Sequence, residues 1–402
     1  MSSTLNNARP GRTRLGRALM ERGALTSDWA PAFAAVDRAS FLPYVMWPYD
    51  MVTGQTVTVD RREDPDAWFV HADRDNPIVT QWDDGRHTGR RPGTVSTSSS
   101  SMPSVVYKLL ADLDAAPGMA VLDVGTGTGE TAGLLTYRCG PRGVTTIDID
   151  RAVSSQARKR LRAVGLPAEA VVGDGFQGYR ENAPYDRILA TCGLRVVPGA
   201  WLEQTRPGGL VLAPWGTDFS PRDAVARLTV ARDGTASGHF VRLVEFMKLR
   251  TQRFVWPDHD SYVSGDWAEA ADRSATTAVE VITAGRFDVL PFAVGLRVAA
   301  CAHTAYEQGD GSRAAWFYSL TADRSWAAVS VEPGVGEAVV YQWGSRRLWD
   351  EVEIAYRWWE DRGRPHVDRF GLTVTPEGHR AWLDTPADSW PVEGSAGCTT
   401  NP

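Results

Sequence analysis

VLDVGTGTGE, residues 121–130, is a short apolar run that ends in three closely spaced glycines. A run of this length followed by such a turn predicts a buried strand that passes directly into a helix. Gly125, Gly127 and Gly129 would let the backbone of the turn approach a nucleotide-like ligand closely. A GxGxG pattern alone does not identify that ligand, so the surrounding sequence has to narrow the choice.

Strand and helix patterns alternate on both sides of this turn. Strands are predicted at 120–125, 143–150, 168–174, 185–191 and 210–216, and helices at 104–114, 130–140 and 152–165. This alternation is typical of a mostly parallel sheet with helices on both faces. Two further strands, at 226–234 and 237–249, are joined at Asp233-Gly234 and predict a terminal antiparallel hairpin.

Three features favour S-adenosylmethionine over a nicotinamide dinucleotide as the ligand. Asp148 ends the second strand, 23 residues after Gly125, where a carboxylate accepts ribose hydroxyls. Asp174, between Gly173 and Gly175, follows the third strand and can reach an adenine edge. The sheet ends in a hairpin and lacks the second mononucleotide half that a dinucleotide needs.

The predicted cofactor site comprises Asp123, Gly125, Thr126, Gly127, Gly129, Asp148, Ile149, Gly173, Asp174 and Gly175. A purely structural alternative stays open for its main members. The glycines would then serve only strand–helix packing, Asp148 would cap the next helix, and Asp174 would be a turn residue.

Composition indicates an ordinary folded protein. The chain has 402 residues, 43% of them apolar and 23% charged, with a net charge of −6, enough for two or three domains. The four cysteines are isolated and the histidines fall into no metal-binding spacing, so no metal site is expected. There is no basic stripe, no signal-like leader and no run of about 18 apolar residues. We therefore expect a cytoplasmic protein without nucleic-acid or membrane partners.

Two segments depart from the βα pattern. Residues 51–92 are rich in charge, glycine and proline, and predict irregular structure with one short strand at 78–82. Residues 253–402 predict a separate α+β domain with a long amphipathic helix at 346–363. Ten of the 16 tryptophans lie between Trp256 and Trp390, which indicates either a well-filled core or an aromatic contact surface.

Residues 171–216, VVGDGFQGYRENAPYDRILATCGLRVVPGAWLEQTRPGGLVLAPWG, resemble the central part of protein-L-isoaspartate O-methyltransferases. AVDRASFLPYVMWPYD, residues 35–50, resembles the first helix and the Phe-Val-Pro segment of that family. The resemblance spans about residues 13–250, interrupted by the 51–92 insertion. It implies a Rossmann-like class I methyltransferase domain over 1–252, with S-adenosylmethionine as cofactor and S-adenosylhomocysteine as product.

The same family has a serine two residues before a proline that contacts the carboxylate being methylated. Ser101-Met102-Pro103 matches that segment, within GTVSTSSSSMPSVV at 93–106. We therefore interpret the serine run as an active-site loop and not as a flexible linker, with Ser98, Ser100 and Ser101 as the catalytic candidates. Neutral hydroxyls suit this role because the carboxylate is itself the nucleophile and needs orientation more than a base.

Other features separate the chain from the repair enzymes. Thr191-Cys192-Gly193 replaces a Gly-Ala-Ala run, Arg195 replaces a proline, and the insertion and the C-terminal extension are foreign to them. With TSSSSMPS, PIVTQWDDG, FMKLR and RRLWDE, the chain resembles the methyltransferases that accompany graspetide-forming ATP-grasp ligases; the lanthipeptide branch is closely similar. That resemblance implies methylation of Asp in a macrocyclised ribosomal precursor peptide, giving aspartimide and then isoaspartate on hydrolysis.

Alternatives remain beside this interpretation. One is general isoaspartate repair, another is a non-enzymatic escort that binds S-adenosylmethionine and a precursor peptide, and a third is nucleic-acid methylation suggested by Ala183-Pro184-Tyr185-Asp186. In the tailoring interpretation, residues 253–402 grip the peptide, through Trp349, Trp358 and Trp359 unless these fill the core. Cys192 has no histidine partner in the sequence pattern and is interpreted as a small packing residue.

Overall fold

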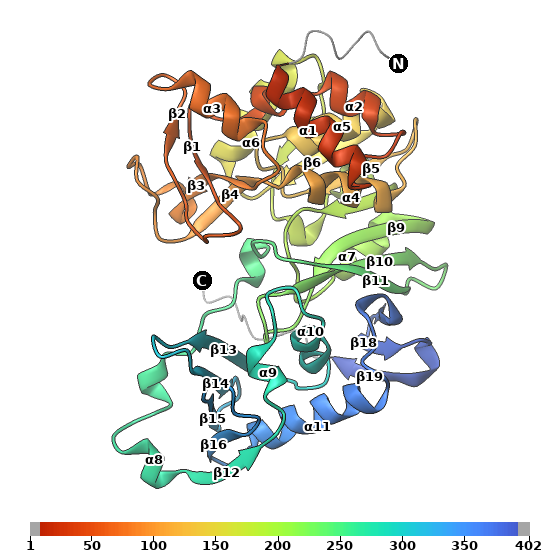
Figure 1. The fold of residues 1–402 in the computed structure, drawn as a ribbon. Helices are drawn as coiled ribbons and strands as arrows, with labels where there is room; N and C mark the ends of the chain where they lie inside the picture. The colour runs from red at the N-terminus through yellow and green to blue at the C-terminus, as the bar shows by residue number, and fades with distance from the viewer. Residues whose placement is uncertain (1–8, 393–402) are drawn as a thin grey trace. The chain divides into compact units, whose positions relative to one another are not determined.

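The computed structural model describes residues 9–392, which form two compact units (Figure 1). The first unit contains the chain up to Cys192, together with Pro198–Leu212 and Thr229–Gly234. The second contains Gly193–Val197, Ala213–Leu228 and the chain from Thr235 onward. The two units are described separately below.

The first unit is built around a parallel sheet with the order β9-β8-β5-β6-β7. Its strands are β5 (Val121–Val124), β6 (Val144–Asp148), β7 (Glu169–Val172), β8 (Tyr185–Ala190) and β9 (Thr205–Trp215). All four residues of β5 are buried, as expected for a strand covered on both faces. The chain runs outward from β5 through β6 to β7, then returns to β8 on the other side. This reversal puts the ligand-binding crevice of such sheets at the carboxyl end of β5.

Helices connect these strands as the alternating pattern predicted. They are α4 (Pro103–Leu113), α5 (Glu130–Cys139), α6 (Arg151–Ala163) and α7 (Gly199–Gln204). Asp150 caps α6 by accepting hydrogen bonds from the backbone N–H groups of Ala152 and Val153 at 2.9 and 3.1 Å. None of the helices within residues 9–392 is long and apolar enough to cross a membrane.

The N-terminal part of the first unit adds helices and a second, smaller sheet. Its elements are α1 (Pro10–Glu21), α2 (Ala30–Ala35), the 3₁₀ helix η2 (Arg38–Phe41), β1 (Val45–Pro48), β2 (Val59–Asp60), α3 (Pro65–Ala72), β3 (Ile78–Trp82) and β4 (Ser96–Ser100). The sheet order is β2-β1-β3-β4. The strand predicted at 78–82 is confirmed, whereas the prediction of otherwise irregular structure for 51–92 is wrong, because β2 and α3 form there.

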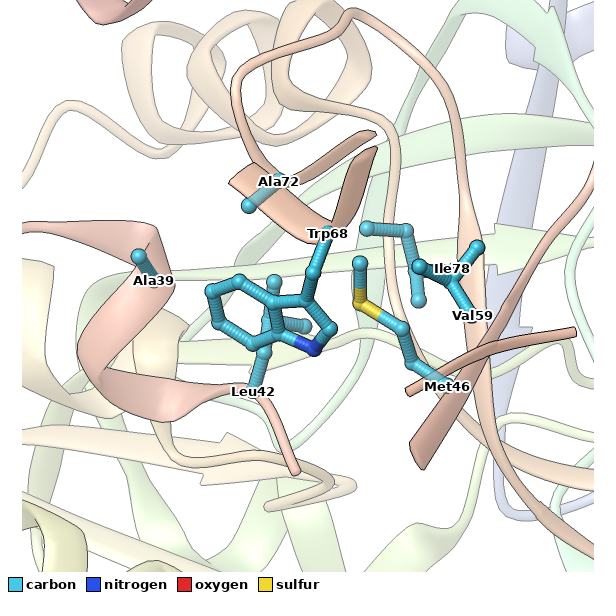
Figure 2. Packing of buried hydrophobic residues seen from close by; sticks show 7 residues of the cluster. All are labelled: Ala39, Leu42, Met46, Val59, Trp68, Ala72 and Ile78. Carbon is cyan, nitrogen blue, oxygen red and sulfur yellow. The ribbon is translucent and has the colours of Figure 1, made fainter. Parts of the chain in front are cut away.

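The insertion has its own hydrophobic core, centred on Trp68. Figure 2 shows the indole ring among the side chains of the surrounding elements: Ala39, Leu42, Met46, Val59, Ala72 and Ile78. The ring is fully buried, and its Nε1–H donates a hydrogen bond to the Pro43 carbonyl at 3.1 Å. This core joins α3 and the small sheet to the segment around η2, so the insertion is a folded part of the first unit.

The second unit contains two sets of neighbouring strands. The first has the order β19-β18-β17-β11-β10, from β10 (Asp223–Val230), β11 (Ala236–Val244), β17 (Phe370–Thr375), β18 (Gly378–Leu383) and β19 (Ser389–Val392). The second is a five-stranded sheet, β12-β16-β15-β14-β13, from β12 (Asp272–Thr276), β13 (Cys301–Glu307), β14 (Arg313–Ser319), β15 (Trp326–Val331) and β16 (Ala338–Trp343). The predicted β10–β11 hairpin and the C-terminal strands are confirmed.

Helices of the second unit are α8 (Trp267–Ala270), α9 (Glu280–Thr283), α10 (Leu290–Gly295) and α11 (Leu348–Asp361), the last being the predicted amphipathic helix. Trp349 and Trp359 are buried at 1% and 7% exposure, so they fill the core and do not offer a peptide contact. Trp358 is half-buried and packs edge-on against Trp390 with ring centroids 5.3 Å apart. Arg195, the residue that replaces a proline, is buried in ion pairs with Asp218 and Asp223.

We expect Trp68→Ala to lower the free energy of unfolding by about 3–5 kcal/mol, because it opens a large cavity in the core of the insertion. Urea unfolding followed by circular dichroism measures this loss. Val52→Ala is the control: Val52 belongs to the same insertion but is 95% exposed, so its truncation should leave the midpoint unchanged. Equal midpoints for Trp68→Ala and the unmutated chain would contradict the packing described here.

Candidate active site

The glycine turn after β5 has the backbone conformation that glycine alone adopts readily. Gly125, Gly127 and Gly129 have φ angles of +95°, +51° and +91°. A Cβ on Gly125 would lie 3.2 Å from Thr191 Oγ1, and one on Gly127 would lie 3.2 Å from the Ser99 carbonyl oxygen. A Cβ on Gly129 would instead meet Ala157 of α6 at 3.1 Å. Gly129 therefore serves helix packing, while Gly127 faces the serine strand.

Asp148 is tied to this turn through its side chain. Its Oδ2 accepts a hydrogen bond from the Gly127 N–H at 3.1 Å, and its Oδ1 accepts one from the Asp150 N–H at 2.9 Å. Helix α6 is capped by Asp150, so the alternative that Asp148 is the helix cap is wrong. Ile149, the next residue, is 39% exposed at the same strand end.

Asp174 follows β7, the neighbour of β6. Its Oδ1 accepts a hydrogen bond from the Phe176 N–H at 2.9 Å, and the Gly173 N–H donates to the Asp148 carbonyl at 3.0 Å. The Gly175 carbonyl accepts a hydrogen bond from the indole of Trp201 at 2.8 Å. The predicted cofactor residues thus lie at the carboxyl ends of three adjacent parallel strands.

Asp123 and Thr126 lie behind the turn. Asp123 is fully buried, its Oδ2 accepts a hydrogen bond from Thr146 Oγ1 at 2.8 Å, and its Oδ1 has no partner within residues 9–392. Burial raises the pKa of Asp123 to about 7. Thr126, also buried, has its hydroxyl 2.8 Å from that of Thr146. The unpaired carboxylate oxygen, the tight glycine turn and the two exposed strand ends fit the polar and nucleoside parts of S-adenosylmethionine.

The serine run forms strand β4 and not the expected loop. It pairs with β3, with Ser98 opposite Gln81 at an irregularity in the register. Alternation along the strand buries Ser98 and Ser100 and leaves Ser99 half-buried, with Ser101 half-buried beyond the strand end. The three serine candidates therefore occupy different environments.

Ser98 and Ser100 differ in what their hydroxyls contact. Ser98 Oγ accepts a hydrogen bond from Thr80 Oγ1 at 3.3 Å. Ser100 Oγ accepts one from Arg38 Nε and donates one to Glu130 Oε2, both at 2.9 Å. The hydroxyl of Ser100 is thereby committed to a buried network and is not directed to a substrate.

A cavity of about 450 Å³ in the first unit brings the serine strand and the glycine turn together. Ser98 of β4 and Gly127 of the turn line it, with Thr80 and Gln81 of β3 and the face of α6 that carries Gln156. Gln81 Nε2 donates a hydrogen bond to the carboxylate of Asp150 at 3.0 Å, which attaches β3 to the start of α6. Strand β3 thus supplies one wall of the cavity.

Arg38 and Glu130, which the sequence analysis missed, organise this region. The Arg38 guanidinium donates hydrogen bonds to the carbonyls of Arg74, Asn76, Ser100 and Ser101 at 3.0–3.2 Å. Glu130, the first residue of α5, lies 3.6 Å from Arg38 Nε, and burial raises its pKa. Little in the sequence indicated either residue: Arg38 stands beside Asp37, and Glu130 follows the glycine turn directly.

Thr191 and Cys192 stand where the sequence departs from the repair-enzyme pattern. Thr191 Oγ1 donates a hydrogen bond to the Gly125 carbonyl at 3.0 Å and so braces the glycine turn. Cys192 is half-buried, with its Sγ 4.0 Å from the Val124 carbonyl.

Comparison with known proteins identifies the relatives of this chain. A family model described as protein-L-isoaspartate(D-aspartate) O-methyltransferase matches residues 74–253. The protein-L-isoaspartate O-methyltransferase of Paracoccus denitrificans is 38% identical over 156 residues, which cover 39% of this chain and 67% of that protein. Protein-L-isoaspartate O-methyltransferase 2 of Polaromonas sp. is 34% identical over 165 residues, which cover 40% of this chain and 77% of that protein.

One solved structure, also named protein-L-isoaspartate O-methyltransferase, matches with a TM-score of 0.52 and 20% identity over 93% of this chain and 100% of its own. That likeness supports the Rossmann-like fold of class I S-adenosylmethionine-dependent methyltransferases. Because it runs over so much of the chain, it includes much of 253–402. The expectation that the C-terminal extension is foreign to the repair enzymes therefore does not hold for this one protein, whereas the relatives from Paracoccus and Polaromonas match only 39% and 40% of this chain.

The Rossmann-like fold and the matches to known proteins together define a methyltransferase that uses S-adenosylmethionine. Within that class, the identity to the Polaromonas protein over three quarters of its length shows that the chain belongs to the protein-L-isoaspartate O-methyltransferase family. It is a carboxyl methyltransferase of that family.

We expect Gly127→Ala to weaken S-adenosylhomocysteine binding at least tenfold, because the added Cβ meets the Ser99 carbonyl and the φ of +51° disfavours alanine. Isothermal titration calorimetry measures the dissociation constant. Gly118→Ala is the matched control, since Gly118 has a φ of +83° in the same unit with nothing within 4 Å of an added Cβ. Its affinity should stay unchanged, and equal weakening by both variants would argue against a local role of Gly127.

Proposed function

We propose that this protein methylates an Asp side-chain carboxylate in a macrocyclised, ribosomally made precursor peptide. The observation that supports this best is the shared cavity, in which Ser98 and Gly127 line one space together with Thr80 and Gln81 of β3. A methyl acceptor held at the serine strand would lie beside the turn that holds the cofactor. The peptide class rests on the resemblance of the serine run and the β3 segment to peptide-tailoring methyltransferases.

The chemistry asks for positioning more than for acid–base catalysis. S-adenosylmethionine, when bound, supplies an electrophilic methyl group. Ser98, which lines the cavity, would donate a hydrogen bond to one oxygen of the substrate carboxylate and leave the other oriented for attack. Ser101 lies beyond the strand end and is the second candidate donor. Neutral donors hold the carboxylate without neutralising the charge that makes it a nucleophile. Ser100 would not contact the substrate; its hydrogen bonds with Arg38 and Glu130 would fix the position of β4.

The later steps need no further group from the protein. In the methyl ester, the backbone nitrogen of the residue after the modified Asp attacks the side-chain carbonyl, loses its proton and expels methanol. The product is a five-membered aspartimide. Water can then open it to isoaspartate. A peptide ring that holds the backbone nitrogen close to the ester would favour closure.

General isoaspartate repair is the second candidate, and the comparisons favour it through the names of the similar proteins. The two functions differ in their acceptor: repair needs an isoaspartyl residue in varied linear peptides, and tailoring needs a normal Asp in one constrained peptide. The shared cavity speaks against a non-catalytic escort, because an escort has no need to place a methyl acceptor at Ser98 beside the glycine turn.

Incubation with S-adenosylmethionine and two peptides tests this choice by mass spectrometry. We expect the ring-closed precursor peptide encoded beside the gene to gain 14 Da and then lose 32 Da as methanol, for about 18 Da net loss. A linear isoaspartyl peptide should stay unmodified. Methyl transfer only to the linear peptide would support general isoaspartate repair in place of peptide tailoring. Methyl transfer to neither peptide would support the non-enzymatic escort.

Substitution of the serines separates catalytic from structural roles. Ser98→Ala and Ser101→Ala should lower kcat at least tenfold with little change in melting temperature, because each removes a donor to the carboxylate. Ser100→Ala should instead lower the melting temperature, since unsatisfied buried polar groups cost about 1–3 kcal/mol each.

Ser96→Ala, at the start of the same strand, is the control and should change neither quantity. Full activity of both Ser98→Ala and Ser101→Ala would show that the serine run does not position the acceptor. A loss of activity confined to Ser100→Ala, at unchanged melting temperature, would move the catalytic role to Ser100.

A further inference from the structure

The cavity beside the serine strand carries an uncompensated positive charge. Arg160 of α6 is the one charged residue among those that line it in the described chain, and the lining includes no carboxylate. The remaining lining residues are apolar or neutral, among them Leu42, Tyr44 and Gln156. The electrostatic environment of this cavity therefore favours an anion.

Arg160 has neither a hydrogen-bond acceptor nor an ion-pair partner within residues 9–392, although its side chain is partly withdrawn from water. Burial lowers the pKa of its guanidinium, with no opposing contribution from an acidic neighbour. By contrast, Arg158 on the same helix donates a hydrogen bond to the Ala170 carbonyl. Holding a guanidinium away from water without a partner costs free energy, which a ligand carboxylate in the cavity would offset.

The position of Arg160 along α6 separates it from the methyl-transfer end of the cavity. The hydrogen bond between Gln81 and Asp150 fixes β3 at the start of the helix. Arg160 is ten residues further on, which corresponds to about 15 Å at the α-helical rise of 1.5 Å per residue. An extended peptide covers that distance in about four to five residues, at roughly 3.3 Å each.

We propose that Arg160 forms a second subsite, which binds the carboxylate of an acidic side chain located about four residues from the methylated position of the peptide substrate. The proposal rests on the proposed function to the extent that the substrate is a peptide. It adds a sequence requirement that methyl transfer itself does not impose. Arginine suits the task because its planar guanidinium binds a carboxylate through two parallel hydrogen bonds.

Peptide binding tests the subsite independently of turnover. The probes are fluorescent peptides, each made in a linear and a ring-closed form, with one Asp or one isoaspartate and with Glu or Lys placed two to six residues away on either side. Each Glu peptide has a Gln counterpart. Fluorescence anisotropy in the presence of S-adenosylhomocysteine gives the dissociation constants for the full chain, Arg160→Gln, Arg160→Glu and Arg162→Gln. Arg162 is the matched control because it lies in the last turn of the same helix and is exposed.

We expect the unmutated protein to bind one Glu peptide about five- to tenfold more tightly than its Gln counterpart, with a preference that falls as salt rises. Arg160→Gln should lose the preference and bind both peptides like the weaker one. Arg160→Glu should transfer the preference to a Lys peptide, and Arg162→Gln should retain it. S-adenosylhomocysteine affinity should be the same in all four proteins.

Three results would overturn the proposal: no Glu preference at any position, including the case in which no peptide binds; equal weakening of both peptides by Arg160→Gln; or weaker S-adenosylhomocysteine binding in that variant. The last result would assign Arg160 to the cofactor. A Glu preference without methyl transfer to any peptide would retain the subsite and reject the proposed reaction.

Discussion

The buried guanidinium of Arg38 is the interaction on which the first unit depends. It donates hydrogen bonds to carbonyls of the segment that follows α3 and to the end of the serine strand, and it lies beside Glu130 of α5. A charge at 3% exposure is tolerated only if its donors are satisfied, and here backbone carbonyls satisfy most of them. The position of β4 relative to the glycine turn follows from this network, because α5 begins directly after that turn.

The same constraint explains why adjacent serines have different roles. Strand alternation places the side chains of Ser98 and Ser100 on one face of β4. The hydroxyl of Ser100, however, both accepts a hydrogen bond from Arg38 and donates one to Glu130. Ser98 is two residues earlier, beyond the reach of the network, and lines the cavity with Gly127. The backbone carbonyl of Ser101 accepts a hydrogen bond from Arg38, so this contact does not involve the Ser101 hydroxyl. A serine-rich strand thus combines a rigid attachment at Ser100 with a hydroxyl at Ser98 that faces the cavity, as the proposed function requires.

Local patterns predicted the parallel sheet, the glycine turn and the hairpin, because each depends on residues close together in the chain. Predictions failed where distant residues decide the structure. The serine run has the composition of a loop, and it becomes a strand only because β3 pairs with it. For Trp349 and Trp359 the sequence left core and contact surface open, and the structure decides for the core because the apolar face of α11 buries them. The ion pairs of Arg195 with Asp218 and Asp223 join positions 23 and 28 residues apart, which no periodicity reveals.

The choice between tailoring and repair depends on the first unit more than on the presence of a second one. The fold likeness extends over 93% of the chain, so the presence of a C-terminal unit does not by itself assign a function to this protein. Strand β3 forms a wall of the cavity and attaches to α6 through Gln81 and Asp150, within the region that the family model matches. Under the proposed function, Arg160, which has no ion-pair partner within residues 9–392, would suit an acceptor whose flanking residues are defined, as they are in a single encoded peptide.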